Sequence, residues 1–450
     1  PVRPGAGGRN FLKCGGNMQS RWQEEYNRKK RTLPEILAAI EDGDFIVTSF
    51  AAMEPMGFLA NLHKIHDRIN RVHVCMVLSP GRYKFVEDPQ YNSKFSTSTW
   101  FMLEPSRIAL REGKIDYVPA NLHEGARRQI DVAAPNVFVA TATPMDKHGY
   151  FRISLSNICE RTWMDTCKKI ILEVNPLVPT VYGDNEIHIS QVDYLYELKR
   201  PLPQIDKMPI TDVERKIGEY VASLVRDGDT IQLGIGSIPD AIAEAFKDKR
   251  DLGIHTEMIT NSMVDLVEWG VVTGRKKTLH RGKIVGTFAL GNQRLYDFLD
   301  HNPSVLMLPG DYVNDPRVIA QNDNMVAINT AIAVDLTGQV AAESIGYRQY
   351  SGTGGQNDMV LGATHSRGGR SIIALRSTAK NDTISKIQTF LPEGSVVSVS
   401  RNSVDYVVTE YGIAFLKSQS LRQRALNLIN IAHPKFREQL RREAEKLYFI

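Results

Sequence analysis

Residues 226–239 read RDGDTIQLGIGSIP, which is a turn, a short apolar strand and a small-residue loop in direct succession. The run 216–225 before this stretch is typical of a helix, and a second helical run, 240–246, follows it. In the Asp-Gly-Asp turn, glycine permits a positive φ and the aspartate side chains bond nearby backbone groups. The stretch therefore predicts a helix–turn–strand–loop–helix unit of an α/β fold.

A second copy of this unit lies near the start of the chain. Residues 41–55 read EDGDFIVTSFAAMEP, between the helix-like runs 33–40 and 58–62. Two copies favour two similarly wound α/β domains with mostly parallel sheets, arising from an internal duplication. The alternative is two unrelated β-turn-α units, because such units are common.

The boundary between the copies is rich in proline. Three prolines fall within residues 201–209, where they break regular structure. Residues 211–214, Thr-Asp-Val-Glu, then have the spacing of a capping box that begins a helix. We predict an N-terminal α/β domain at 23–205 and a C-terminal α/β domain at 206–450.

Downstream segments extend the α/β pattern. The apolar, β-rich runs 304–308 and 395–399 alternate with helical stretches, which indicates layers with mostly parallel strands. The last helix, 435–448, is amphipathic and strongly charged, so we expect it to cover the surface.

Composition excludes several classes of protein. A chain of 450 residues exceeds one ordinary core. The 55 Lys and Arg residues against 51 Asp and Glu give a net charge of only +4, scattered along the chain, so no nucleic-acid surface is indicated. No apolar run reaches the roughly 18 residues of a membrane span, so we expect no membrane partner.

The four cysteines form no CxxC pair and have no histidine at metal-ligand spacing. We therefore expect no metal site and no disulfide framework, and a reducing compartment. Cys75 lies in an apolar run, which favours a buried structural thiol. The cysteines are Cys14, Cys75, Cys159 and Cys167.

The first 23 residues contain four basic residues and no acidic one. Residues 1–22 are predicted to be a processed organellar leader, or added residues ahead of a natural start at Met18. The expected location is the cytoplasm, or the mitochondrial matrix if the segment is a leader.

Three segments are candidates for chemistry. The loop 234–239 follows a strand and opens a helix, so its backbone N–H groups can meet an anion; a structural tight turn is the other interpretation. It lacks the third glycine of a dinucleotide fingerprint, which disfavours a nicotinamide oxidoreductase. The loop 350–358, YSGTGGQND, is typical of an oxyanion hole or of a flexible surface turn.

The third segment, 253–259, reads GIHTEMI and alternates like a strand. Alternation places His255 and Glu257 on one face and the apolar neighbours on the other. A carboxylate at the end of such a strand points into the crevice where ligands bind in open sheets. Without further context, an exposed glutamate in a salt bridge is the simpler alternative.

Together these segments resemble the acetyl-CoA hydrolase/transferase branch of the class I CoA transferases. The likeness is closest to the 4-hydroxybutyrate CoA-transferases and butyryl-CoA:acetate CoA-transferases, and it runs from Trp22 to the C-terminus. Residues 414–418 depart from the pattern, with Ala-Phe-Leu-Lys-Ser where many relatives have Ala-Asp-Leu-Arg-Gly, which puts local packing in doubt. The matching segments are 234–241, 253–258, 351–356 and 408–412, with weaker support from 187–190 and 432–434.

The resemblance implies a set of site residues. Glu257 would be the catalytic nucleophile, Gly355 would supply an oxyanion-hole N–H, and Asn314 would assist the glutamate. No metal and no permanently bound cofactor are implied, because coenzyme A or acyl-CoA is the substrate, and a homodimer or dimer of dimers is expected. The expected CoA contacts are Gly234, Ile235, Gly236, Ser237, Ile238, Ser351, Gly355 and Lys380.

The expected activity is CoA transfer between a short-chain acyl-CoA and a free carboxylate by ping-pong kinetics. With an ordinary pKa near 4, Glu257 would be ionised at pH 7 without a base. It would carry the acyl group as an anhydride and then CoA as a glutamyl thioester. An acyl-CoA hydrolase using the same intermediate is the alternative, and a sensor of CoA or sugar phosphates is a remote one. Acetate, butyrate and 4-hydroxybutyrate stay open as acids, since a pocket separates them by only a few kcal/mol.

Overall fold

The computed structural model describes residues 18–447 and Ile450. The N-terminal segment predicted to be a leader or added residues therefore lies outside the described residues up to position 17. The first helix, α1 (Met18–Lys29), begins at Met18. No helix in the described part of the chain is both long and apolar enough to cross a bilayer.

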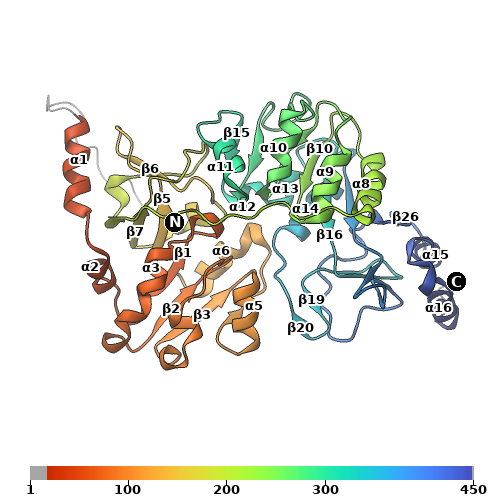
Figure 1. Cartoon of the computed structure of the whole chain (residues 1–450), viewed down its shortest axis with the longest axis horizontal. Helices are drawn as coiled ribbons and strands as arrows, with labels where there is room; N and C mark the ends of the chain where they lie inside the picture. Colours follow the sequence, from red (N-terminus) through yellow and green to blue (C-terminus); the bar gives the residue numbers. More distant parts are fainter. Residues whose placement is uncertain (1–17, 448–449) are drawn as a thin grey trace.

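A seven-stranded sheet, parallel throughout, forms the centre of the first half of the chain (Figure 1). In spatial order its strands are β4 (Asp116–Tyr117), β3 (Phe95–Thr99), β2 (Val72–Cys75), β1 (Phe45–Thr48), β5 (Val137–Ala142), β7 (Lys169–Val174) and β9 (Tyr194–Glu197).

A six-stranded sheet forms the centre of the second half, and only its edge strand β26 runs antiparallel. In spatial order its strands are β11 (Gly253–Ile254), β10 (Thr230–Leu233), β16 (Met325–Thr330), β21 (Arg370–Ala374), β25 (Tyr406–Thr409) and β26 (Gly412–Phe415).

The two sheets are wound in the same way. The order β2-β1-β5-β7-β9 in the first corresponds to β11-β10-β16-β21-β25 in the second. Short crossover helices join most of the parallel strands, as a parallel sheet requires. The predicted fold, two similarly wound and mostly parallel α/β domains, is confirmed.

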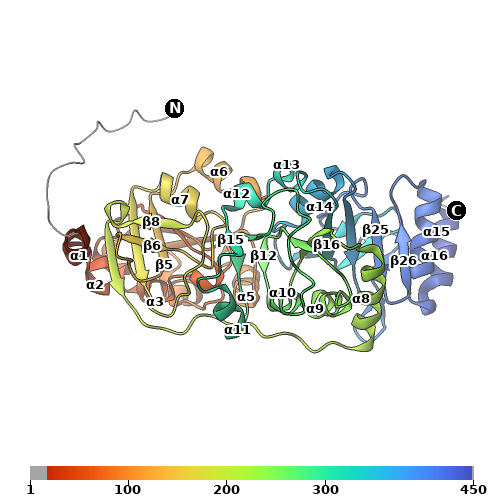
Figure 2. The ribbon, with the colours of Figure 1, turned by 90° about the horizontal axis from the view of Figure 1, so that it is seen from above.

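Helices flank both sheets. Figure 2 shows α1 near one end of the long axis and the pair α15 and α16 at the other. The predicted surface helix is confirmed as α16, which buries only Leu440 and Ala444. The helices after α1 are α2 (Leu33–Ala38), α3 (Met56–Asn61), α4 (Lys84–Glu87), α5 (Glu104–Arg111), α6 (Leu122–Val132), α7 (Glu160–Thr166), α8 (Asp212–Leu224), α9 (Ser237–Ala245), α10 (Asn261–Glu268), α11 (Gln293–Leu299), α12 (Gly310–Val313), α13 (Pro316–Ile319), α14 (Gln356–His365), α15 (Leu421–Ile431) and α16 (Pro434–Lys446).

Short strands form smaller sheets around the two large ones. The predicted strand at 304–308 is present as β15, but the strand predicted at 395–399 is wrong, because only Val399 forms a bridge there. That run lies beside the edge of a small sheet and leaves Val396 and Val397 exposed. The small pairs are β6 (Tyr150–Arg152) with β8 (Glu186–His188), β12 (Met258–Ile259) with β14 (Phe288–Ala289), β13 (Ile284–Gly286) with β15 (Val305–Met307), β19 (Ser344–Ile345) with β20 (Arg348–Gln349) and β22 (Thr378–Ala379) with β23 (Ile384–Ser385), and the three-stranded sheet joins β17 (Ala333–Asp335) to β18 (Val340–Ala341) and β24 (Ile387–Gln388).

The two Asp-Gly-Asp turns repeat one another in detail. Gly43 and Gly228 have φ values of 84° and 82°, the positive range that favours glycine. The aspartates that follow them, Asp44 and Asp229, accept backbone hydrogen bonds from the residue three positions earlier at 2.8 and 2.7 Å. The same bonds at the same positions support the internal duplication.

The strand register also matches residues beyond the turns of the two copies. His73 lies beside the first residue of β1, and Gly253 lies beside the first residue of β10. Four residues further along each chain segment stand Val77 and Glu257. Val77 is thus the counterpart of Glu257 in the first copy.

The connection between the two halves has no helix or strand from residue 198 to 211. Figure 2 shows it running along one side of the molecule to α8. The capping box predicted at its end is confirmed, since Thr211 N–H donates to the Glu214 carboxylate at 3.0 Å. The boundary at 205/206 falls within this segment and stays a prediction.

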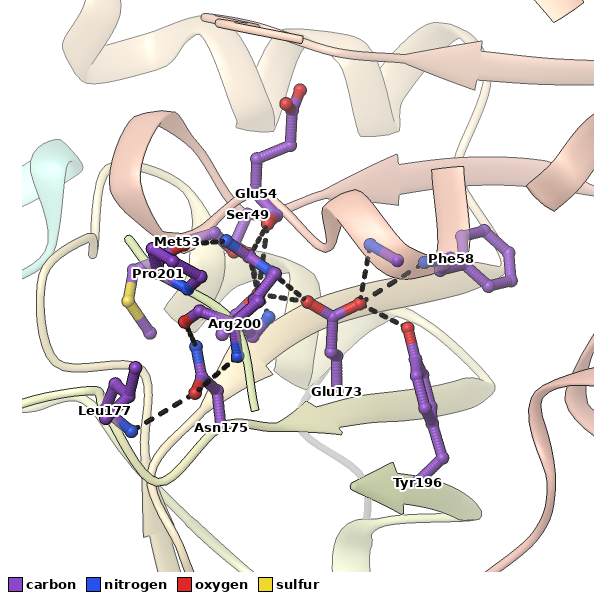
Figure 3. A network of polar contacts seen from close by, with 12 residues as sticks. Ser49, Met53, Glu54, Phe58, Glu173, Asn175, Leu177, Tyr196, Arg200 and Pro201 are labelled. Atoms are coloured by element: carbon purple, nitrogen blue, oxygen red, sulfur yellow. Dashed lines mark hydrogen bonds and ion pairs between the residues drawn. The ribbon is translucent and has the colours of Figure 1, made fainter. Parts of the chain in front are cut away.

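A buried polar network fixes the start of this connection (Figure 3). Arg200 donates from Nε to Glu173 Oε1 at 2.7 Å, and from Nη2 to Thr141 Oγ1 at 2.9 Å and to the Glu54 carbonyl. The second oxygen of the fully buried Glu173 accepts from the Tyr196 hydroxyl and from two backbone N–H groups of α3. Each buried charge therefore has its hydrogen-bonding partners.

One apolar core cluster contains buried residues from both halves of the chain. It includes Phe138 and Leu172 of the first sheet and Ile231 and Ile328 of the second. Cys75 is also buried in it, which confirms the predicted structural thiol. The continuous core holds the two halves against each other around the site.

Candidate active site

Glu257 lies between two strands rather than at the end of one. The chain leaves the large sheet after β11, and β12 pairs instead with β14, so the prediction of one continuous strand over 253–259 is wrong. Thr256 N–H donates to the Val285 carbonyl at 3.0 Å, and the Glu257 carbonyl accepts from Thr287 and Phe288 at 2.9 and 3.1 Å. The backbone of Glu257 is thus held by a neighbouring layer of strands.

His255 links the Glu257 segment to the segment that carries Asn314. It is fully buried, and its Nε2 donates to the Val313 carbonyl at 2.8 Å. Burial lowers the pKa of His255 to about 3, so the ring is neutral. The next residue after Val313, Asn314, donates from Nδ2 to Glu257 Oε2 at 3.0 Å. His255 and Glu257 therefore face the same segment, in agreement with the predicted alternation.

Gly355 approaches the same carboxylate from the other side. Its backbone lies directly against the Glu257 carboxylate, and the Gly355 N–H lowers the pKa of that carboxyl. A Cβ atom on residue 355 would overlap Glu257 Oε2 and Asn314 Nδ2, so only glycine leaves room for this contact. The structure brings together the three residues predicted as catalytic, although they are far apart in the sequence.

Burial changes the expected protonation of Glu257. It raises the pKa of this carboxyl to about 7, and the hydrogen bond from Asn314 opposes the rise. The negative charge of Asp358 raises the pKa further, and the Gly355 N–H lowers it. The expectation of an ordinary pKa near 4 is corrected, because the cavity walls remove most of the water that stabilises the ion.

An ion pair beside the site joins the two halves of the chain. Asp358, in the first turn of α14, is fully buried and accepts from His123 Nδ1 at 2.8 Å and from His123 N–H at 3.1 Å. Its hydrogen bond raises the pKa of His123, which favours the charged ring. The pair ties α6 to the helix that Gly355 caps.

Glu257 lines a cavity of about 280 Å³. Four residues predicted as CoA contacts also line it: Gly234, Ile235, Ser351 and Gly355.

The other predicted CoA contacts lie outside the lining of this cavity. Gly236 caps α9, and Ser237 and Ile238 are in its first turn, since α9 begins at Ser237 rather than at Asp240 as predicted. Lys380 is exposed in the β22–β23 hairpin, with a φ of 50°. The structure does not bring Lys380 to the cavity.

Sequence reasoning missed the apolar wall that the first half of the chain contributes. These contacts cross between the two halves, and no local pattern encodes them. Only Val77 could have been identified from the sequence, because it occupies the position in the first repeat that Glu257 occupies in the second. The wall residues are Val77, Leu78, Phe101, Leu103, Leu122 and Ile158.

Within the described residues, no group of three or more His, Cys, Asp or Glu side chains could hold a metal ion. At the cavity, the Glu257 carboxylate accepts from the Asn314 amide and lies against the backbone of Gly355.

Comparison with known protein families gives two matches, with residues 206–290 between them. Residues 16–205 match the acetyl-CoA hydrolase/transferase N-terminal domain, and residues 291–444 match the acetyl-CoA hydrolase/transferase C-terminal domain.

Individual relatives cover nearly the whole chain. The 4-hydroxybutyrate coenzyme A transferase of Clostridium kluyveri is 42% identical over 95% of this chain and 100% of its own length. The succinyl-CoA:cyclohexane-1-carboxylate CoA transferase of Geobacter metallireducens is 43% identical over 96% of this chain and 98% of its own. Among solved structures, RipA from Yersinia pestis superimposes with a TM-score of 0.90 at 36% identity, covering 95% of this chain and all of RipA.

Proposed function

The chain belongs to the acetyl-CoA hydrolase/transferase family, and from that premise we propose that it transfers coenzyme A between a short-chain acyl-CoA and a free carboxylate such as acetate. Glu257 would carry first the acyl group and then CoA. Relatives of similar length named as CoA transferases support the reaction class.

One observation carries the proposal for this mechanism. The Glu257 carboxylate lies at a largely apolar cavity, where Asn314 Nδ2 donates to it at 3.0 Å and the backbone of Gly355 lies directly against it. A carboxylate held in this way needs no metal and no serine to act as a nucleophile. Both groups lie where negative charge changes during acyl transfer.

The first step moves the acyl group to the enzyme. A Glu257 oxygen attacks the thioester carbonyl, the C–S bond breaks, and CoA leaves as a thiolate. The product is a mixed anhydride between the acyl group and Glu257. The ionised carboxylate is a far stronger nucleophile than the protonated acid, so the raised pKa makes the step depend on pH near neutrality.

The second step moves CoA to the enzyme. The thiolate attacks Cδ of Glu257, the bond from Cδ to the bridging oxygen breaks, and the first carboxylic acid leaves as its anion. Charge develops on the remaining glutamyl oxygen, and Asn314 with the Gly355 N–H would stabilise it as an oxyanion hole. Removal of one such donor typically costs on the order of 3 kcal/mol of barrier. A second carboxylate then reverses both steps.

Coenzyme A would approach along the glycine loop after β10. Gly234 and Ile235 lie at the cavity, and Gly236 opens α9, whose N-terminal N–H groups favour an anion. Ser237, Ile238, Ser351 and Lys380 stay proposed contacts, with Lys380 available only to a part of CoA beyond the cavity. We expect neither a bound metal nor a permanent cofactor.

The test is to trap the glutamyl thioester. The protein is incubated with butyryl-CoA alone, reduced with borohydride, digested and analysed by mass spectrometry. We expect the Glu257 peptide to be reduced to the alcohol in wild type and unchanged in Glu257→Gln, which should also lose transfer activity. Glu54→Gln is the matched control, because Glu54 is buried, has a pKa raised by burial to about 7 like that of Glu257, and does not line the cavity.

The same experiment separates the alternatives. Release of CoA at the same rate with and without acetate indicates a hydrolase that uses this glutamate. Binding of CoA with neither release nor label indicates a sensor. Full transferase activity in Glu257→Gln would remove Glu257 from the mechanism.

The oligomeric state and the cellular location of the protein are also proposals. The family resemblance supports a homodimer or dimer of dimers, which sedimentation equilibrium would measure. Cytoplasmic placement, or the mitochondrial matrix after removal of a leader, also stays a proposal that fractionation would test.

A further inference from the structure

The walls of the cavity differ between the two halves of the chain. The second half contributes all of the polar side chains, among them Gln232, Asn329 and Ser351, together with the glycine loops. The first half contributes only apolar side chains, from Val77 to Ile158. An acyl-CoA has a polar CoA part and an apolar acyl group, so it would bind with the acyl group toward the first half of the chain.

The cavity is also poor in charge. Of the described side chains that line it, Glu257 is the one charged group, and none is lysine, arginine or histidine. A second carboxylate on the acyl group would lose its hydration, find no cation and be repelled by Glu257. Burying an unpaired carboxylate is strongly unfavourable. The lining therefore selects against dicarboxylic acids.

A second cavity of about 190 Å³ lies behind the apolar wall. Leu122 and Ile158 line both cavities, so these two residues lie between them. Leu122 begins α6, and the Ile158 carbonyl accepts from Gly310 N–H at 3.1 Å, at the start of the short helix that leads to Asn314. The partition is thus anchored next to the catalytic carboxylate.

We propose that the site takes monocarboxylic acids whose acyl chain is uncharged and apolar, and that Leu122 and Ile158 set the upper limit of the chain length. This inference rests on the proposed transferase activity, whose acyl site it describes. The space beyond the two side chains is closed to the substrate in this structure and becomes available when either side chain is shortened.

The expected effect follows from the burial of methylene groups. Each methylene that reaches the apolar wall should raise kcat/KM about fourfold, until the chain meets Leu122 and Ile158. Beyond that length kcat/KM should fall, because a packed wall does not accept extra atoms.

The experiment measures kcat/KM for acetate, butyrate, hexanoate, octanoate and succinate as acceptors from acetyl-CoA, with labelled acetyl-CoA for the acetate reaction. We expect succinate to be at least a hundredfold poorer than butyrate in wild type. In Leu122→Ala and Ile158→Ala, the optimum should move to longer acids by about two carbons. Leu103→Ala is the matched control, because Leu103 lines the main cavity but not the second one.

Each outcome has one meaning. Absence of transfer to every acid in wild type overturns the proposed function itself. Transfer to succinate within tenfold of butyrate overturns the apolar selectivity while leaving the activity intact. A chain-length profile that moves equally in Leu103→Ala, or in none of the variants, overturns the partition. Leu122→Val and Ile158→Val provide milder versions, with the same direction expected, if an alanine variant fails to fold.

Discussion

Replacing Glu257 by glutamine should stabilise the substrate-free protein at neutral and alkaline pH. The carboxyl is held in a cavity that raises its pKa from 4.5 to about 7, chiefly through burial. The folded protein therefore resists ionisation of this group, whereas the unfolded chain does not. Glutamine keeps the size of the side chain and an oxygen that can accept from Asn314, but it carries no charge.

The magnitude follows from the two pKa values. At about 1.4 kcal/mol for each pKa unit, the rise corresponds to at most about 3 kcal/mol of unfolding free energy. Since the pKa is raised in the folded state, the wild-type contribution is fully present below pH 4.5 and is lost as the pH rises through 7. The stability difference between the variant and wild type should grow across this window and be constant above it.

Thermal melting from pH 5 to pH 8 measures this difference. At about 2–4 °C for each kcal/mol in a domain of 150–250 residues, the variant should melt up to roughly 10 °C higher at pH 8 and only slightly higher at pH 5, since pH 5 lies just above the ordinary pKa of 4.5. Glu445→Gln, which removes an exposed carboxylate of α16, is the control and should show no such trend. A difference that stays flat from pH 5 to pH 8, or a less stable variant at pH 8, would refute the reasoning.

Three further predictions concern the site and the network at the start of the connection. Gly355→Ala has no backbone strain, since φ is −93°, but its methyl group would displace Glu257 and Asn314, so kcat should fall on the order of 10²–10³-fold without loss of melting temperature. In wild type, kcat/KM should rise with pH through about 7 as Glu257 ionises, and a profile already flat above pH 5 would contradict the raised pKa. Arg200→Met leaves the fully buried Glu173 without its cation, so urea denaturation should show a loss of about 3–5 kcal/mol.

The last of these predictions has an internal control. Arg200→Met combined with Glu173→Gln removes both charges and should recover much of the stability. If the double variant is as unstable as the single one, packing rather than an unpaired charge explains the loss.

The overall architecture could be predicted from the sequence because the repeat is local. The Asp-Gly-Asp turns, their strands and the helices beside them depend on residues close together in the chain. The same approach failed for 395–399, since β-branched residues there indicate a strand only if an edge is available for pairing. It also failed for 253–259, where the strand breaks because a second layer of strands takes over its hydrogen bonds.

The site was predictable only through family resemblance. Glu257, Asn314 and Gly355 lie far apart in the sequence, and no spacing rule joins them. The pKa of Glu257 could not be predicted in this way, because it depends on walls from the other half of the chain. Lys380 stays a proposed contact, and the structure leaves it outside the cavity lining.

The matching register of the two copies has a consequence for the symmetry of the site. Val77 and Glu257 occupy equivalent positions in the two copies, and both line the same cavity. Two identical copies facing each other would present two glutamates to one cavity, and each charge would oppose ionisation of the other. Joining the copies in one chain frees each to differ, so one supplies the proposed nucleophile and the other a neutral wall. Because the two halves line the cavity with different side chains, the acyl group and the CoA of a substrate would meet different surfaces, which favours one orientation of the bound substrate.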